Sequence, residues 1–247
     1  MVNKHSAFIN LQLLDVRLGF HVIAFLHLVI LAIVTLSIDT TVDEDVRVRA
    51  YIHLRWKLLT SWYNFLTLAY LPLCIYYDCQ QKRGFGHARH VQKIRDLTDL
   101  IMTGILFPII LSGCILFWGL MNVDPSLIGP SRVFDYLPNW CQHSLHSVPT
   151  AMVFLDLLLT PRSRPKSLVP RFLLAAGFVA FYSLMVYISH QNGEVIYTLF
   201  TRIGDFNTVI FMTISYILYI SLFFIQWKII GYVWGPEALK QKFKEKL

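Results

Sequence analysis

Long apolar runs alternate with short polar segments along the whole chain. Six of these runs are each roughly 20 residues or slightly longer, enough to cross the ~30 Å hydrocarbon core of a bilayer as tilted helices. They cover residues 17–38, 57–77, 97–120, 138–159, 170–190 and 207–234. The pattern predicts an all-α, polytopic membrane protein, a single domain over residues 1–247 built as a bundle of six transmembrane helices. The first run is too long for a signal peptide and lacks a small-residue cleavage site, so we expect it to be retained.

Composition supports this class and makes an ordinary soluble domain untenable. Hydrophobic residues make up 55% of the chain and charged residues only 15%, against about 25% in soluble domains. The net charge of +7 follows topology, because 16 of the 22 Lys and Arg residues lie on one side of the predicted spans. Both termini are therefore predicted to be cytoplasmic, and we expect membrane lipids rather than nucleic acid as partners. The expected location is the endoplasmic reticulum or the plasma membrane, as an integral multi-pass protein.

Two polar residues lie on one stripe of the second predicted span. Thr60 stands about one turn beyond the interfacial Trp56, and Asn64 follows one turn later on the same face. A threonine can simply return a hydrogen bond to its own helix backbone, and an asparagine can bond a neighbouring helix. The alternative is that this face borders a polar pocket.

The fourth predicted span carries histidines that are costly in hydrocarbon. His143 and His146 are three residues apart and share one helix face. Pro149 cannot donate to the carbonyl of Leu145, so that carbonyl needs another partner. The histidines either bond to neighbouring helices or line a polar pocket at the outer end of this helix. His190, which ends the fifth span on the same side, is a further candidate for that pocket.

The topology also predicts where these groups lie in depth. His146 is ~9 Å beyond the interfacial Trp140 along its helix, and Thr60 is ~6 Å beyond Trp56 along its own. The second and fourth spans begin on the same side of the membrane. Thr60 and His146 are therefore predicted at similar depth in one leaflet, although helix neighbours do not follow from topology alone.

Several motifs in fixed order resemble a known family. The stretch "KLLTSWYNFLTLAYLPLCIYYD" contains Thr60, and "PNWCQHSLH" fits the pattern P-x-W-x-x-H-x-x-H and ends at His146. Later, "RIG" and "GYVW" fall where the family has similar residues. The chain resembles, from about Arg55 onward, the androgen-induced gene 1 family, which includes the androgen-dependent TFPI-regulating protein.

The resemblance implies an intramembrane threonine hydrolase acting on fatty acid esters of hydroxy fatty acids. Carried over position by position, it places the nucleophile on Thr60 and the catalytic histidine on His146. We expect His143, Asn64, Trp140 and His190 to bind substrate or support the site. Where the family often has Asp or Asn three residues after the threonine, this chain has Tyr63, so the supporting groups differ. No metal and no cofactor is expected, and the four cysteines show no CxxC spacing.

Two other classes of function are compatible with the sequence. Haem held between imidazoles needs a histidine from a second helix, such as His21 or His190. A lipid-binding or transport protein would use the same polar pocket without chemistry at Thr60.

Overall fold

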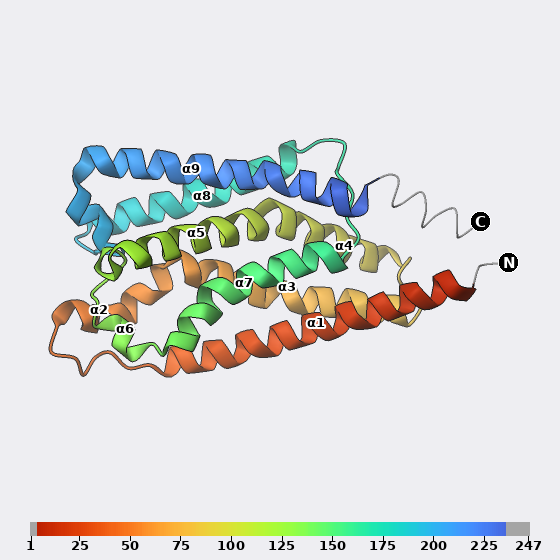
Figure 1. The fold of residues 1–247 in the computed structure, drawn as a ribbon, viewed down its shortest axis with the longest axis horizontal. Helices are drawn as coiled ribbons and strands as arrows, with labels where there is room; N and C mark the ends of the chain where they lie inside the picture. The colour runs from red at the N-terminus through yellow and green to blue at the C-terminus, as the bar shows by residue number, and fades with distance from the viewer. Residues whose placement is uncertain (1–3, 236–247) are drawn as a thin grey trace.

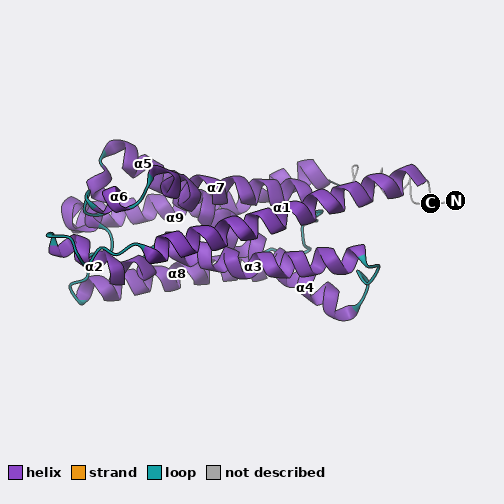
Figure 2. Ribbon diagram, turned by 90° about the horizontal axis from the view of Figure 1, so that it is seen from below, coloured by secondary structure: helices purple, strands orange, loops and turns teal. Residues whose placement is uncertain are grey.

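The structure is an elongated helical bundle. The computed structural model describes residues 4–235, and every regular element in this part of the chain is a helix. The helices run roughly along the long axis of the molecule (Figure 1, Figure 2). Their bounds are α1 Lys4–Ser37, α2 Val46–Leu54, α3 Leu59–Lys82, α4 Arg89–Ile101, α5 Phe107–Val123, α6 Val133–Tyr136, α7 Asn139–Leu159, α8 Val169–Gln191 and α9 Thr198–Trp234.

The two ends of the described chain lie at the same end of the bundle (Figure 1). This arrangement fits termini on one side of a membrane. Which side that is stays a prediction, and the basic segment 240–246 that contributes to it lies outside the described residues.

Each predicted span corresponds to a long helix or a pair of helices. The prediction of 138–159 differs from α7 by one residue, whereas 97–120 is divided between α4, a π-helical turn and α5. Four helices are long and apolar enough to cross a membrane, namely α1, the continuous α4–α5 pair, α8 and α9. Together α2 and α3 make a fifth candidate, bent by 41°. Because α7 is not among them, the sixth span rests on the sequence pattern.

Two helix irregularities have identifiable causes. Pro108 lacks the N–H that would bond four residues back, and the chain widens into the π-helical turn Met102–Leu106 just before it. Gln226 of α9 donates to the carbonyl of Thr103 in this turn, at 2.7 Å. In α9, Gly204 adopts a positive φ of 73°, which kinks the helix three residues before the predicted apolar run begins at residue 207.

A break at Leu58 sets the beginning of α3. Leu58 is extended, with φ −69° and ψ 139°, and it separates α3 from the 3₁₀ turn Arg55–Lys57. No side chain caps α3 in the usual manner; the Leu59 N–H instead donates to the hydroxyl of Tyr197, at 3.0 Å. Thr60 is consequently the second residue of a new helix.

A buried ionic cluster connects three helices. It lies towards the end of the bundle that holds both ends of the described chain. Asp78 of α3 accepts from Arg17 and His21 of α1, at 2.8 Å each. The other ring nitrogen of His21 lies 3.1 Å from Asp156 of α7, and Arg162 pairs with Asp156 at 2.6 Å. A neutral imidazole has only one N–H, so a ring facing two carboxylates is satisfied when it carries both protons. The cluster therefore links three helices through charge as well as packing.

Candidate active site

A cavity of about 750 Å³ lies at the opposite end of the bundle, between the starts of α3 and α7. Its wall is mostly apolar and draws on α1, α5, α8 and α9 as well as the loop before α9. Pockets for small-molecule ligands typically have about 300–1,000 Å³. The size and character of this cavity suit a lipid-like ligand.

Thr60 lines this cavity. Among the described residues, no backbone carbonyl accepts a hydrogen bond from its hydroxyl. Two other hydroxyl residues of α3 do bond to backbone carbonyls: Thr67 donates to the carbonyl of Tyr63 at 2.7 Å, and Ser61 donates to the carbonyl of Arg55 at 2.5 Å. No such backbone bond within the described part of the chain holds the hydroxyl of Thr60. It is therefore available to the cavity rather than held by its own helix.

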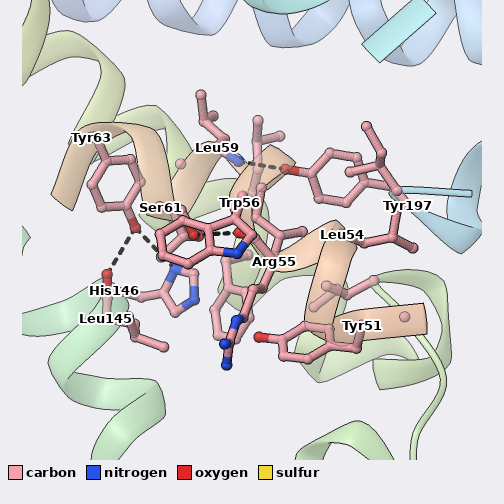
Figure 3. Close-up of a pocket in the computed structure, with 18 of the residues that line it drawn as sticks. Tyr51, Leu54, Arg55, Trp56, Leu59, Ser61, Tyr63, Leu145, His146 and Tyr197 are labelled. Carbon is pink, nitrogen blue, oxygen red and sulfur yellow. Dashed lines mark hydrogen bonds between the residues drawn. The ribbon is translucent and has the colours of Figure 1, made fainter. Parts of the chain in front are cut away.

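His146 lines the same cavity from α7 and is 5% exposed. Its ring stacks on that of Phe117, with centroids 3.4 Å apart and planes 7° apart. Its Nδ1 lies 3.2 Å from the hydroxyl of Tyr63. These two contacts fix the ring, and Figure 3 shows the imidazole beside Tyr63 among the labelled residues of the cavity. Thr60 and His146 therefore line one cavity, whereas their matching depth in the membrane stays a prediction.

The carbonyl that Pro149 leaves free has found its partners. Tyr63 donates to the oxygen of Leu145 at 2.9 Å (Figure 3). The amide nitrogen of Asn64 donates to the same oxygen at 3.3 Å. The expectation that this carbonyl needs another partner is confirmed. Asn64 thus belongs to the site as a support for α7, since one of its two amide N–H groups donates to Leu145.

The Tyr63 hydroxyl also sets the tautomer of His146. A tyrosine has a single proton, and a carbonyl can only accept, so the proton of Tyr63 goes to Leu145. The contact with His146 then requires a protonated Nδ1 that donates to Tyr63. This assignment leaves the lone pair on Nε2, which has no hydrogen-bond partner among the described residues.

Three other residues expected at the site lie outside the cavity lining. His143 is exposed, stacks on Trp118 with centroids 4.8 Å apart, and lies 3.2 Å from the hydroxyl of Ser147. Trp140 is 47% exposed, and His190 is exposed as well. Of the residues predicted for the site, the structure brings together Thr60, Asn64 and His146.

Two cavity residues escaped the sequence reasoning, and helical spacing could have indicated both. Tyr63 stands one turn after Thr60, and Gln142 stands one turn before His146 on the same helix face. Tyr63 is completely buried, as its aromatic ring suggests, yet its hydroxyl organises the site.

An ion pair borders the cavity. Lys57 contacts Glu194, which lines the cavity from the loop before α9. Hydrogen bonding to Lys57 holds the pKa of the Glu194 carboxyl below its usual range. Glu194 is therefore ionised at neutral pH and leaves no proton-donating carboxyl at this position. Among the side chains of residues 12–235, no three His, Cys, Asp or Glu are grouped as metal ligands would be.

Comparison with known proteins gives one family throughout. The sequence model described as FAR-17a/AIG1-like protein matches residues 16–229. An androgen-dependent TFPI-regulating protein of Mesocricetus auratus is 29% identical over 165 residues, covering 67% of this chain and 71% of the relative. The protein of that name from Homo sapiens is 26% identical over 189 residues, covering 76% and 81%. The androgen-induced gene 1 protein of Homo sapiens is 21% identical over 196 residues, covering 77% and 82%. No solved structure matches the chain.

Proposed function

This chain belongs to the FAR-17a/AIG1-like family, and from that premise we propose that it is a membrane hydrolase with Thr60 as nucleophile and His146 as general base. Its substrates would be fatty acid esters of hydroxy fatty acids. One observation carries the proposal. A threonine free of its own backbone and a histidine with an unpartnered nitrogen share one lipid-sized cavity.

The mechanism follows from the chemistry of the two side chains. A threonine hydroxyl is a weak nucleophile until a base removes its proton. When the ester binds, the hydroxyl of Thr60 donates to Nε2 of His146, because catalytic hydrogen bonds commonly tighten only in the complex. Its oxygen attacks the ester carbonyl, and Nε2 accepts the proton.

Collapse of the tetrahedral intermediate breaks the bond to the hydroxy fatty acid. His146 returns its proton to that leaving oxygen, and the acyl group stays on Thr60. A water molecule, deprotonated by His146, then attacks the acyl carbon, and the proton passes back to Thr60 as the fatty acid leaves. The apolar wall of the cavity would hold the acyl chains throughout.

The direct test is to supply purified protein, in detergent and in lipid vesicles, with a branched fatty acid ester of a hydroxy fatty acid. Wild type is expected to release both acids, measured by mass spectrometry. An acid quench during turnover of a long-chain p-nitrophenyl ester should find the acyl group on the peptide that contains Thr60. A parallel preparation of the Thr60→Val protein controls for contaminating lipases.

Absence of release by folded wild type would contradict the proposal. If such a preparation carried intact lipid instead, a lipid-binding or transport function would take its place. A haem absorption band would favour redox chemistry, although both ring nitrogens of His21 already face carboxylates.

Tyr63→Phe provides a finer test of how His146 is held. Without the hydroxyl, the Nδ1 proton has no acceptor and both tautomers become accessible. We expect kcat to fall by about tenfold to a hundredfold, less than the ~10²–10⁴-fold that general base catalysis contributes. The KM should change little, and loss of one hydrogen bond to Leu145 should cost about 1–3 kcal/mol of unfolding free energy. A kcat equal to that of wild type would show that Tyr63 only supports the fold.

A further inference from the structure

We propose that Gln142 and the first turn of α3 form the oxyanion-binding site of this protein, an inference that rests on the proposed ester hydrolysis. When the oxygen of Thr60 bonds to the ester carbon, the carbonyl π electrons move onto the carbonyl oxygen. That oxygen carries the negative charge until the bond to the leaving oxygen breaks. Hydrogen-bond donors directed at it lower the barrier more than any other group in many acyl transfers.

Gln142 is a buried amide without a protein partner. It lines the cavity and is 5% exposed. Its Nε2 is enclosed by protein and has no hydrogen-bond partner, and its Oε1 bonds to no described residue either. Buried polar groups are nearly always paired, and an unpaired one costs about 1–3 kcal/mol. A ligand oxygen in the cavity would supply the missing partner.

A second buried glutamine gives a direct comparison. Gln226 is 0% exposed, and its Nε2 donates to the carbonyls of Thr103 and Phe223, at 2.7 and 3.0 Å. A glutamine can therefore be buried in this bundle with its amide nitrogen fully hydrogen-bonded. Of these two glutamines, Gln226 lacks a partner at its Oε1, whereas Gln142, in the cavity wall, lacks one at its amide nitrogen.

The position of Gln142 suits an oxyanion donor. It lies four residues before His146, so the two side chains project from one face of α7. The terminal torsion of a glutamine is broad and roughly two-fold, so its NH₂ group can turn towards a carbonyl oxygen in the cavity. A donor one turn from the general base can reach the carbonyl oxygen while the base reaches Thr60.

The first turn of α3 supplies an independent donor. The break at Leu58 starts a helix of 24 residues, whose N-terminal end carries a partial positive charge. The Leu59 N–H bonds to Tyr197, and the N–H groups of Ser61 and Trp62 bond to the carbonyl of Leu58. The N–H of Thr60 has no acceptor among the described residues. The nucleophile thus carries its own backbone donor beside the reacting carbon.

Two other residues considered from the sequence are poorly placed for this role. The hydrogen bond to Leu145 orients the amide of Asn64 and uses one of its two N–H groups, and Trp140 is 47% exposed and outside the cavity lining.

The test replaces Gln142 by methionine, which keeps the length of the side chain and removes the donor. Removing one oxyanion donor costs about 10²–10³-fold in kcat, so we expect a loss of that size with KM within about threefold of wild type. Affinity for a long-chain trifluoromethyl ketone, which forms a tetrahedral adduct with the nucleophile, should fall in parallel. Affinity for the non-hydrolysable ether analogue of the substrate should stay unchanged, which also shows that the cavity is folded.

Gln226→Met is the matched control, since it removes a buried amide far from the cavity and should leave kcat unchanged. If Gln142→Met binds the ether poorly, Gln142→Leu is measured in the same way. The inference is overturned if wild type hydrolyses the ester while the Gln142 variants keep the kcat of wild type, whether or not their KM rises. If wild type itself is inactive, the proposed function fails and the oxyanion site with it, so the two failures are distinguishable.

Discussion

Thr60→Val is expected to lower kcat for ester hydrolysis by about 10³-fold or more, with KM within about threefold of wild type. Valine has nearly the volume and branching of threonine, so the cavity wall keeps its shape and only the hydroxyl is lost. The reaction then has no nucleophile that can hold the acyl group. Catalysis that survives would come from substrate binding and from groups that stabilise the oxyanion.

The measurement is release of free fatty acid by folded protein at saturating ester. Thr60→Ser keeps a hydroxyl and should retain readily measurable turnover. Thr67→Val is the matched control, because Thr67 is on the same helix, bonds to its own backbone and does not line the cavity. Equal activity of Thr60→Val and wild type would rule out a threonine mechanism.

His146→Ala should be as damaging as Thr60→Val, and the double variant no slower than either single one, because the two side chains act as a unit. His143→Ala is the comparison one turn away on α7. Its ring is exposed and rests on Trp118 outside the cavity, so we expect kcat within about threefold of wild type. A larger loss of kcat in His143→Ala than in His146→Ala would show that the assignment of His146 as the general base is wrong.

The apolar runs locate the long helices because helix length in a bilayer is set by its thickness, but α1 begins 13 residues and α9 nine residues before the predicted runs. For the fourth run, 138–159, the prediction and α7 differ by one residue. The same helix is not among those that are long and apolar enough to cross a membrane. The polar residues that make up the candidate site, such as Gln142 and His146, are what lower its hydropathy. Polar residues at a candidate site therefore make the helix that carries them harder to identify as a span from hydropathy.

The candidate site could be predicted only in part. Thr60, Asn64 and His146 are polar residues in apolar runs, and that contrast is visible in the sequence. Tyr63 gives no such contrast, because tyrosine is common in membrane helices and its role depends on a carbonyl 82 residues away. Gln142 becomes notable only once its lack of partners is known.

The ionic cluster was beyond sequence reasoning for a related cause. His21 contacts Asp78 and Asp156, which are 57 and 135 residues away in the chain. Each of these residues alone can be explained by a helix end or an interface. Their meeting depends on which helices are neighbours, and topology does not fix that.

Asp156→Asn is expected to destabilise the fold by about 3–5 kcal/mol, because it leaves buried cations without their counter-charge. His21 is 2% exposed, Asp156 3% and Arg162 5%, so water cannot replace the lost carboxylate. For a chain of this length the change corresponds to a fall in Tm of roughly 10 °C, measured by thermal unfolding in detergent. Asp96→Asn, at an exposed position on α4, should change stability by less than about 0.5 kcal/mol.

The cluster is distinguishable from the catalytic site because it lies about 15 Å along α7 from His146. Asp156→Asn should therefore keep the kcat of wild type per folded molecule at a temperature where it is still folded. Replacing the pair by apolar residues of similar size, Asp156→Leu with Arg162→Met, should recover much of the lost stability, since breaking a buried pair costs more than removing it. Unaltered stability of Asp156→Asn would show that the charges are not what holds α1, α3 and α7 together. A lost kcat in the folded variant would instead make Asp156 part of the chemistry.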